Sequence, residues 1–165
     1  SQKFHLLKGP LRGETFVTKK IVSALCRISV NKLQEFYLGN LYSRRDWGHA
    51  KDYVVAIWKM LQQKKAKDYV IATGKQYSVK DFINLVAKEL KISISWKGRG
   101  LQEKGYLNNK KVISIDKKYF RPTEVNSLLG DAKKARKDLN WKPQFNIRAL
   151  VKDMVAEELK ILKND

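Results

Sequence analysis

The segment at residues 69–74 places the strongest constraint on the fold, because it is a compact apolar run, YVIATG, that a glycine closes. A short apolar run with little alternation is typical of a buried strand. Ser78 follows as a candidate N-cap, with Asp81 as an acidic partner in the first turn of a helix that we expect to run to Leu90. A buried strand followed by a capped helix favours a mixed α/β chain.

Helical periodicity predicts four more helices. Apolar residues recur at helical spacing from Glu14 to Val30, from His49 or Ala50 to Gln63, and from about Ile147 to Leu162. Asp131 is expected to cap a lysine-rich helix that ends near Asn140. The apolar stripe expected on the second of these helices consists of Tyr53, Val54, Ile57, Trp58 and Leu61.

Shorter stretches predict strands between these helices. They are residues 35–38, which stop at the Gly39-Asn40 turn signal, residues 92–97 and residues 112–116. Residues 98–109 are expected to form a loop. The chain has 165 residues, enough for one well-packed domain, and contains neither internal repeats nor a low-complexity linker. Mixed α/β is therefore the predicted fold class.

Composition limits the broad class of the protein. The hydrophobic fraction is 43%, and no apolar run approaches the roughly 20 residues that cross a bilayer. Residues 1–9 lack the apolar core and the cleavage site of a secretory signal. We therefore expect a soluble, cytoplasmic protein without a membrane partner. Cys26, the single cysteine, lies in a helical apolar pattern and is expected to be a buried, inert thiol.

The formal net charge of +19 is high enough to suggest nucleic acid or an anionic membrane as a ligand. The lysines, however, are spread from Lys3 to Lys163, whereas a nucleic-acid footprint is usually concentrated on one face and interleaved with exposed aromatic residues. A lysine-biased surface is the favoured interpretation. We therefore expect non-specific attraction of polyanions at low salt and no specific nucleic-acid ligand.

Two arginine-containing motifs point to an anionic ligand. Arg45 opens the motif RDWGHAKDY at residues 45–53, and Arg121 lies within YFRPTEV at residues 119–125. The planar guanidinium donates paired hydrogen bonds to phosphate oxygens and stays charged at any working pH. Two such arginines brought together form a clamp for a pyrophosphate, which favours a nucleotide-like ligand. Weak surface ion pairs are the alternative for each arginine taken alone.

Several segments, in the same order, resemble the C-terminal half of GDP-mannose 4,6-dehydratases, members of the extended short-chain dehydrogenase/reductase superfamily. The likeness extends from about Pro10 to Leu162. The segments that carry it are RGETFVTKKI at 12–21, YLGN at 37–40, residues 45–53, residues 69–74, EKG at 103–105, residues 119–125 and LNWKP at 139–143. The resemblance implies the substrate-binding portion of an NAD(P)-binding Rossmann-type sugar-nucleotide dehydratase, without the N-terminal dinucleotide-binding strands.

The resemblance also implies a substrate and a cofactor. These lyases oxidise C4 of GDP-mannose with NADP, eliminate water across C5 and C6, and return the hydride at C6 to give GDP-4-keto-6-deoxymannose, a step toward GDP-fucose. The family's glycine-rich turn, its catalytic threonine and glutamate, and its Tyr-x-x-x-Lys pair precede the matching region. Tyr77 and Lys80, three residues apart, do not replace that pair. The resemblance therefore implies no catalytic residue here, with most of the NADP site missing.

What the matching region implies is a nucleotide-sugar pocket. By the resemblance, Val17 and Lys20 line the GDP site. Arg45 and Arg121 hold the diphosphate, and Glu124 accepts hydrogen bonds from a ribose hydroxyl. These roles agree with the chemistry of the side chains, since arginines neutralise a diphosphate and a carboxylate accepts hydrogen bonds from a sugar diol.

Residues 1–9 do not match the family, so the substrate-binding region is assigned to residues 10–165. Where the family has FNHESP, this chain has HLLKGP, so that Leu6 replaces an asparagine that meets substrate and Leu7 a histidine near the cofactor. Leucine makes neither hydrogen bond. We interpret residues 1–9 as an unrelated leader and expect a truncated gene product or a fragment. Arg12, just beyond the leader, matches a position that contacts NADP.

Other polar and aromatic residues have structural interpretations. Asp46 and Asp52 flank the start of a predicted helix and are expected to cap it or to interact with its dipole. His5 and His49 lack cysteine or acidic partners at ligand spacing, so no metal site is predicted. Large aromatic side chains are core candidates. The tryptophans in this group are Trp47, Trp58, Trp96 and Trp141.

Three functions are compatible with the sequence. The first is a fragment of a GDP-mannose 4,6-dehydratase that works with a separate N-terminal dinucleotide-binding half. The second is a non-catalytic pseudoenzyme that binds a nucleotide sugar or a partner, and the third is a basic nucleic-acid-binding protein. The first function, a fragment of the enzyme, is favoured. We expect the chain alone to be catalytically inactive. An exposed sheet edge and exposed apolar surface are expected to promote self-association.

Overall fold

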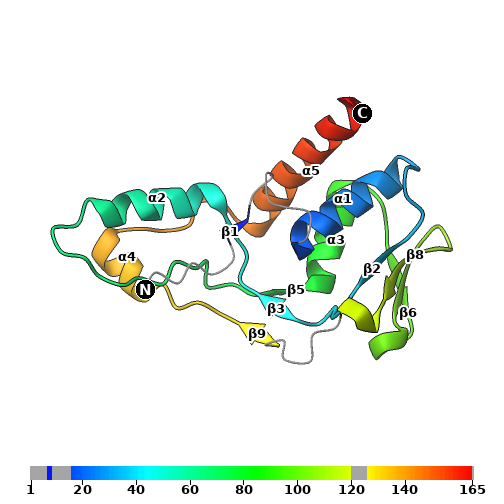
Figure 1. Cartoon of the computed structure of the whole chain (residues 1–165), viewed down its shortest axis with the longest axis horizontal. Helices are drawn as coiled ribbons and strands as arrows, with labels where there is room; N and C mark the ends of the chain where they lie inside the picture. Colours follow the sequence, from blue (N-terminus) through cyan, green and yellow to red (C-terminus); the bar gives the residue numbers. More distant parts are fainter. Residues whose placement is uncertain (1–6, 9–15, 120–125, 165) are drawn as a thin grey trace.

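The computed structural model describes residues 7–8, 16–119 and 126–164. The molecule is elongated, with a broad body and a narrower arm (Figure 1). The body contains helices α1 (Val17–Ser29), α3 (Val79–Glu89) and α5 (Ile147–Asn164) together with a four-stranded sheet. The arm contains α2 (Ala50–Leu61) and α4 (Lys133–Leu139). Each helix predicted from the sequence is present, and the mixed α/β class is confirmed.

The three helices of the body share one hydrophobic core with the sheet. Helices α1, α3 and α5 pack on one another, and Phe36 and Ile113 contribute from the strands. Burial of each large apolar side chain stabilises the fold by about 1.5–3 kcal/mol. Side chains that are fully buried in this core include Ile21, Leu25, Phe82, Ile83, Leu150 and Met154.

The sheet of the body has the strand order β2-β8-β7-β6. Strands β2 (Phe36–Leu38) and β8 (Lys110–Ile115) are parallel, whereas β7 (Lys104–Leu107) runs antiparallel to β8 and to β6 (Ser95–Lys97).

The predicted loop at residues 98–109 is wrong, because β7 and β8 form a hairpin preceded by the 3₁₀ helix η1 (Gly100–Gln102). Asn108 and Asn109 form its two-residue turn with positive φ of 49° and 62°, the geometry that matches the twist of the flanking strands.

A second, three-stranded sheet of order β5-β3-β9 lies where the arm joins the body (Figure 1). Its strands are β5 (Tyr77–Ser78), β3 (Arg44–Arg45) and β9 (Ser127–Leu128). β3 is central, antiparallel to β5 and parallel to β9. A further parallel pair joins β1 (Leu7–Lys8) to β4 (Gly48–His49). The pairing of β3 with β9 brings residues 44–45 beside residues 127–128, which are distant in the sequence.

The arm has a hydrophobic core of its own, built from α2, α4 and residues 69–72. Tyr53 and Trp141 are fully buried there, and the Trp141 indole Nε1–H donates to the Asp52 carbonyl at 2.9 Å. The apolar run at residues 69–74 is buried as predicted but forms only an isolated bridge at Ile71. At the end of the run, the backbone N–H groups of Thr73 and Gly74 donate to the Asp46 carboxylate instead of to a neighbouring strand.

One face of α2 lies outside this core. Its apolar side chains Val54, Trp58 and Leu61 are 61%, 60% and 75% exposed. The prediction of Trp58 as a core residue is therefore wrong, because α4 and residues 69–72 cover only the face that carries Tyr53 and Ala56. Trp47 and Trp141 are buried as expected. Within the described ranges, none of the helices combines the length and the apolar character needed to span a bilayer.

Candidate functional site

Lys20 lies near the start of α1, where its N–H donates to the carbonyl of the N-cap residue Phe16 at 2.9 Å. Its Nζ stands 3.9 Å from the ring centroid of Tyr119 in the 3₁₀ helix η2 (Lys117–Tyr119). Burial lowers the pKa of Lys20, and the nearby charge of Asp116 only partly opposes that effect. The N-cap residue of α1 is Phe16, which has no side-chain acceptor for the first backbone N–H groups. Lys20 and the positive end of α1 therefore form one cationic environment, with Val17 in its first turn.

Arg45 lies in the central strand of the three-stranded sheet and pairs with Leu128. Its side chain is half-buried, and Nη1 donates to the carbonyl of Arg44 at 2.9 Å. The Arg44 N–H donates to the carbonyl of Asn126 at 2.8 Å, which extends the pairing toward residue 125. The strand thus fixes the backbone that carries Arg45 beside the end of the second arginine motif.

The segment at residues 120–125 connects these two places. Tyr119, which precedes it, contacts Lys20, and Asn126, which follows it, bonds to Arg44. Arg121 and Glu124 fall on this segment and lie outside the described residues, as does Arg12. The structure therefore brings Lys20 to one end of the segment and the strand of Arg45 to the other, whereas the roles expected for Arg12, Arg121 and Glu124 stay predictions.

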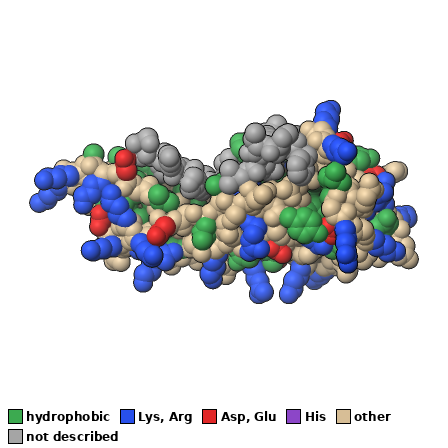
Figure 2. All heavy atoms as spheres, turned by 90° about the horizontal axis from the view of Figure 1, so that it is seen from below, with side chains coloured by type: hydrophobic (Ala, Val, Ile, Leu, Met, Phe, Trp, Pro, Cys, Tyr) green, Lys and Arg blue, Asp and Glu red, His purple; other side chains and the backbone are tan. Residues whose placement is uncertain are grey.

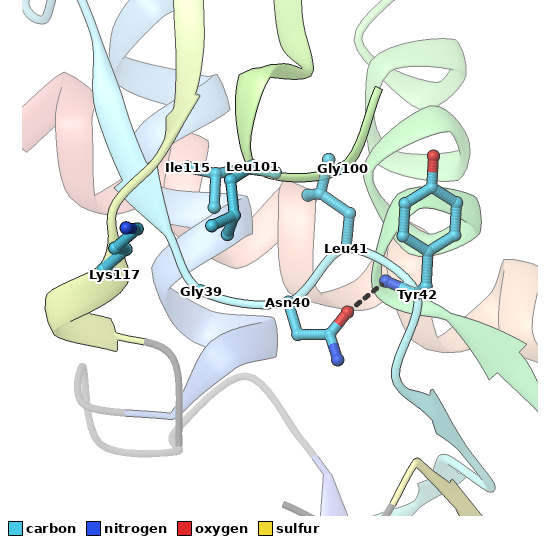
Figure 3. Close-up of a pocket in the computed structure, with 8 residues that line it drawn as sticks. All are labelled: Gly39, Asn40, Leu41, Tyr42, Gly100, Leu101, Ile115 and Lys117. Carbon is cyan, nitrogen blue, oxygen red and sulfur yellow. Dashed lines mark hydrogen bonds between the residues drawn. The ribbon is translucent and has the colours of Figure 1, made fainter. Parts of the chain in front are cut away.

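A cavity of about 470 Å³ opens between the end of β2, the 3₁₀ helix η1 and the end of β8 (Figure 3). The side chains of Leu101 and Ile115 lie opposite the Gly39–Asn40 backbone (Figure 3). A volume of this size suits a small organic ligand or part of a larger one. The residues that line it are Gly39, Asn40, Leu41, Tyr42, Gly100, Leu101, Ile115 and Lys117.

A partly buried ionic network, centred on Glu103, supports one wall of this cavity. The Tyr42 hydroxyl donates to Oε2 of Glu103, and Lys80 Nζ donates to Oε1 of the same carboxylate at 2.5 Å. Glu103 is 3% exposed. Burial alone would raise the pKa of Glu103, but the hydrogen bonds from Lys80 and Tyr42 and the charge of Lys80 outweigh it, so that the pKa is lowered. Glu103 is therefore a carboxylate anion at neutral pH.

Sequence reasoning assigned no role to Tyr42, Lys80 or Glu103. The three residues come from a loop, a helix and the end of a 3₁₀ helix, and 61 positions separate Tyr42 from Glu103. No local pattern indicates contacts over such a separation. The only sequence feature that drew attention to Glu103 was the EKG segment at residues 103–105, which contributed to the family resemblance and was not predicted to be a site.

Asp46 and Asp52 organise loops instead of capping α2. Asp46 accepts hydrogen bonds from Thr73 and Gly74, and Asp52 accepts from the backbone N–H groups of Gln144 and Phe145 at 2.9 and 3.0 Å. The cap of α2 is His49, whose Nδ1 accepts from the Lys51 N–H at 3.2 Å. Capping of α2 by either aspartate is therefore wrong as an expectation, whereas the alternative, an interaction with the helix dipole, agrees with the position of Asp52 in the first turn.

The single cysteine, Cys26, lies in the core of the body. Cys26 is fully buried, and burial raises the pKa of its thiol to about 12, so that almost no thiolate forms at neutral pH. The described part of the chain contains no group of three or more His, Cys, Asp or Glu side chains arranged to hold a metal ion.

Comparison with known proteins identifies the fold and the family. A family model described as GDP-mannose 4,6 dehydratase matches residues 4–154. The chain belongs to the GDP-mannose 4,6-dehydratase family. The match includes Val17, Lys20 and Arg45, the three predicted site residues that the structure describes, and it also includes the cavity.

Curated relatives in this family are about twice as long as the chain. The GDP-mannose 4,6-dehydratase of Sinorhizobium fredii is 48% identical over 158 residues, which are 94% of this chain and 45% of that protein. GDP-mannose 4,6 dehydratase 2 of Caenorhabditis elegans is 46% identical over 159 residues, 96% of this chain and 42% of that protein. The chain thus spans less than half the length of these relatives.

Solved structures share the fold at low sequence identity. RMD from Pseudomonas aeruginosa, solved with NADPH, superposes with a TM-score of 0.77 at 16% identity, over 94% of this chain and 46% of that chain. A UDP-glucose 4-epimerase from Thermotoga maritima, solved with UDP-glucose, gives 0.73 at 19% identity, over 98% of this chain and 46% of that chain. The chain therefore shares its fold with somewhat less than half of each of these two proteins.

Side chains close the N-termini of α2 and α3 in this GDP-mannose 4,6-dehydratase homologue. In Rossmann folds the cofactor pyrophosphate sits at a helix N-terminus after a glycine-rich turn. Here Ser78 and Asp81 close the N-terminus of α3 with reciprocal hydrogen bonds of 3.0 and 2.9 Å, and His49 caps α2. The sequence contains no G-x-G-x-x-G motif. The first backbone N–H groups of both helices thus have side-chain acceptors within the chain.

Proposed function

We propose that this chain forms the nucleotide-sugar-binding portion of a GDP-mannose 4,6-dehydratase, which uses NADP to convert GDP-mannose to GDP-4-keto-6-deoxymannose and water. One observation carries the proposal. Within a region that matches the family, Lys20 and the strand of Arg45 flank the two ends of the segment that contains Arg121 and Glu124. Tyr119 and Asn126, the described residues on either side of this segment, thus contact residues that lie far earlier in the chain. Positive charge at both contacts would attract an anionic ligand.

The charges of these residues suit a nucleoside diphosphate. Arg45 and Arg121 would neutralise the diphosphate through charge-assisted hydrogen bonds, with Lys20 adding a third cation. Glu124 would accept hydrogen bonds from ribose hydroxyls, and Val17 would contact the nucleoside. Arg12 is proposed to contact NADP.

Catalysis requires groups that the described residues do not offer, since hydride transfer needs the bound cofactor and a positioned acid and base. We propose that a dinucleotide-binding half supplies them, so that the chain alone binds GDP-mannose without turning it over. NADP-dependent turnover by the purified chain would overturn this part of the proposal. Turnover that appears only when an N-terminal half is added would support it.

Binding is tested by isothermal titration calorimetry with GDP at fixed salt. Each charge-assisted hydrogen bond contributes about 1.5–3 kcal/mol, so Arg45→Ala should weaken GDP binding by about tenfold to a hundredfold. Arg44→Ala is the matched control. Arg44 is the neighbouring residue on the same strand, and successive side chains of a strand point to opposite faces. Equal losses in both variants, or no GDP binding at all, would contradict the proposal.

Nucleic-acid binding is the competing explanation for the charge of +19. Figure 2 shows Lys and Arg side chains spread along the length of one face rather than gathered in one patch. Binding of duplex DNA should therefore be weak at physiological salt and should fall steeply as salt rises. Tight duplex binding that persists at physiological salt would favour the competing function.

A further inference from the structure

The imidazole of His49 connects the arm to the body. The start of α2 lies close to the start of α5, and β4, which ends at His49, contacts both helices (Figure 1). The ring is 1% exposed. Its Nδ1 accepts a hydrogen bond from the Lys51 N–H at 3.2 Å, which caps α2 in the arm. Its Nε2 lies 3.1 Å from Oδ2 of Asp153, a residue of α5 in the body. One side chain thus contacts both parts of the molecule.

These two contacts fix the hydrogen atom of the ring. A ring nitrogen that accepts a hydrogen bond carries no hydrogen itself, so Nδ1 is unprotonated. A neutral imidazole has one N–H, which then lies on Nε2 and donates to the Asp153 carboxylate. Both nitrogens therefore have partners, as buried polar groups normally do. The hydrogen-bond geometry of His49 thus requires the neutral Nε2–H tautomer.

The charged groups near the ring come from two helices. On α5, Asp153 also lies 3.6 Å from Lys51 Nζ, and Glu157, one turn further, pairs with a lysine of its own helix. On α2, the Asp52 carboxylate accepts hydrogen bonds from two backbone N–H groups of the segment before α5. Phe145 of that segment stacks on the imidazole with ring centroids 4.4 Å apart. β1 pairs with β4 through the backbone. Asp153 is thus the carboxylate that meets the ring.

We propose that His49 is a proton-sensitive cap, which fastens the first turn of α2 when the ring is neutral and releases it when the ring is protonated. A proton from solvent forms an N–H bond at Nδ1, so the imidazolium can no longer accept from the Lys51 N–H. The Nε2–H bond to Asp153 persists, and its donor gains a charge opposite to that of the acceptor. Protonation therefore frees the start of the arm helix while the contact with the body remains. Histidine ordinarily changes charge between about pH 5 and pH 8, which places the release in a mildly acidic range.

Nuclear magnetic resonance of the full chain measures the ring and the cap together. The chain has two histidines, so His5→Gln assigns the ring signals of His49. At about pH 8, Nδ1 should give the chemical shift of a ring nitrogen without hydrogen, and Nε2 that of an N–H. As the ring titrates, the protection of the Lys51 amide against hydrogen exchange should fall at the same midpoint. The expected loss is about threefold to thirtyfold, the range for removal of an N-cap.

The cap of α3 is the internal control. There the Ser78 hydroxyl, which does not titrate in this range, accepts from the Asp81 N–H at 3.0 Å, so protection of that amide should stay constant. His49→Asn supplies an amide oxygen that caps the helix at every pH, and it should remove the pH dependence at Lys51. Asp153→Asn keeps an acceptor for Nε2–H without the charge, and it should preserve the release.

Three results would each overturn the proposal. They are a neutral ring with its hydrogen on Nδ1, a ring that stays neutral down to about pH 5, and protection at Lys51 that parallels protection at Asp81 throughout the titration. None of the three requires a substitution of His49, so they decide the question even where His49→Asn does not fold.

Discussion

Lys19 Nζ lies 2.5 Å from the Glu158 carboxylate, and the two side chains join α1 to α5 inside the body with almost no exposure to solvent. A buried pair of this kind is costly to break because the remaining partner keeps an uncompensated charge. The helix that carries Lys20 is therefore anchored by an ion pair one residue away.

Glu158→Gln should lower the free energy of unfolding by about 3–5 kcal/mol, since it leaves the Lys19 ammonium buried without its counter-charge. The measurement is urea denaturation followed by circular dichroism. Glu157→Gln is the matched control, because Glu157 pairs with Lys160 at 3.6 Å on the surface of the same helix, where an ion pair contributes at most about 1 kcal/mol. Similar losses in the two variants would show that the buried pair contributes no more than a surface pair.

The same pair makes stability sensitive to acid. Burial alone would raise the pKa of Glu158, but hydrogen bonds from Lys19 and Ser23 and the charge of Lys19 outweigh it, so the folded-state pKa lies below the ordinary value of 4.5. A depressed folded-state pKa contributes stability that is present above about pH 4.5 and is lost as pH falls through the folded-state value. Urea midpoints are measured from about pH 6 down to about pH 3. As the pH falls, the midpoint should decrease more steeply for the original chain than for Glu158→Gln. Parallel profiles would contradict the assignment.

Asp46 holds the end of the buried 69–74 run next to Arg45. One oxygen accepts from the Thr73 N–H at 3.0 Å and from its hydroxyl at 2.6 Å, and the other accepts from the Gly74 N–H at 2.8 Å. Asp46→Ala leaves these donors without their acceptor, so it should cost about 1–3 kcal/mol and speed hydrogen exchange at the Thr73 and Gly74 amides. Asp131→Ala is the control, because Asp131 accepts from the Lys133 N–H at an exposed position. Unchanged hydrogen exchange at the Thr73 and Gly74 amides in Asp46→Ala would contradict the role of these hydrogen bonds.

Local sequence patterns predicted those elements whose stabilising contacts are also local. The two residues of the capping box, Ser78 and Asp81, are three positions apart, and the structure confirms the box. The Asn108-Asn109 turn was an equally local signal for a hairpin, but the glycines and charged residues around it led to the prediction of a loop.

Partners that are distant in sequence account for the other errors. Burial of residues 69–72 followed from their composition, whereas the hydrogen bond that ends the run comes from Asp46, which lies 27 positions before Thr73. The hydrogen bond between Tyr42 and Glu103 likewise joins residues 61 positions apart, and no local sequence pattern predicts it. The family resemblance supplied what periodicity lacked, an expectation that Lys20 and Arg45 belong to one site.

The exposed apolar face of α2 provides the last prediction. Apolar residues occur on so much of the circumference of α2 that its periodicity did not reveal which side packs inward. The exposed side carries Val54, Trp58 and Leu61 on one stripe, since positions four and three apart in a helix are neighbours. Apolar patches of this kind mark association surfaces.

We therefore expect concentration-dependent self-association that Trp58→Glu reduces without loss of stability, because Trp58 is 60% exposed. Leu129→Glu, at an equally exposed site on another element, should leave association unchanged. Sedimentation velocity over a hundredfold range of concentration, on the order of two decades, measures the effect. A monomer at every concentration would refute the prediction, and equal effects of the two substitutions would place the association surface elsewhere.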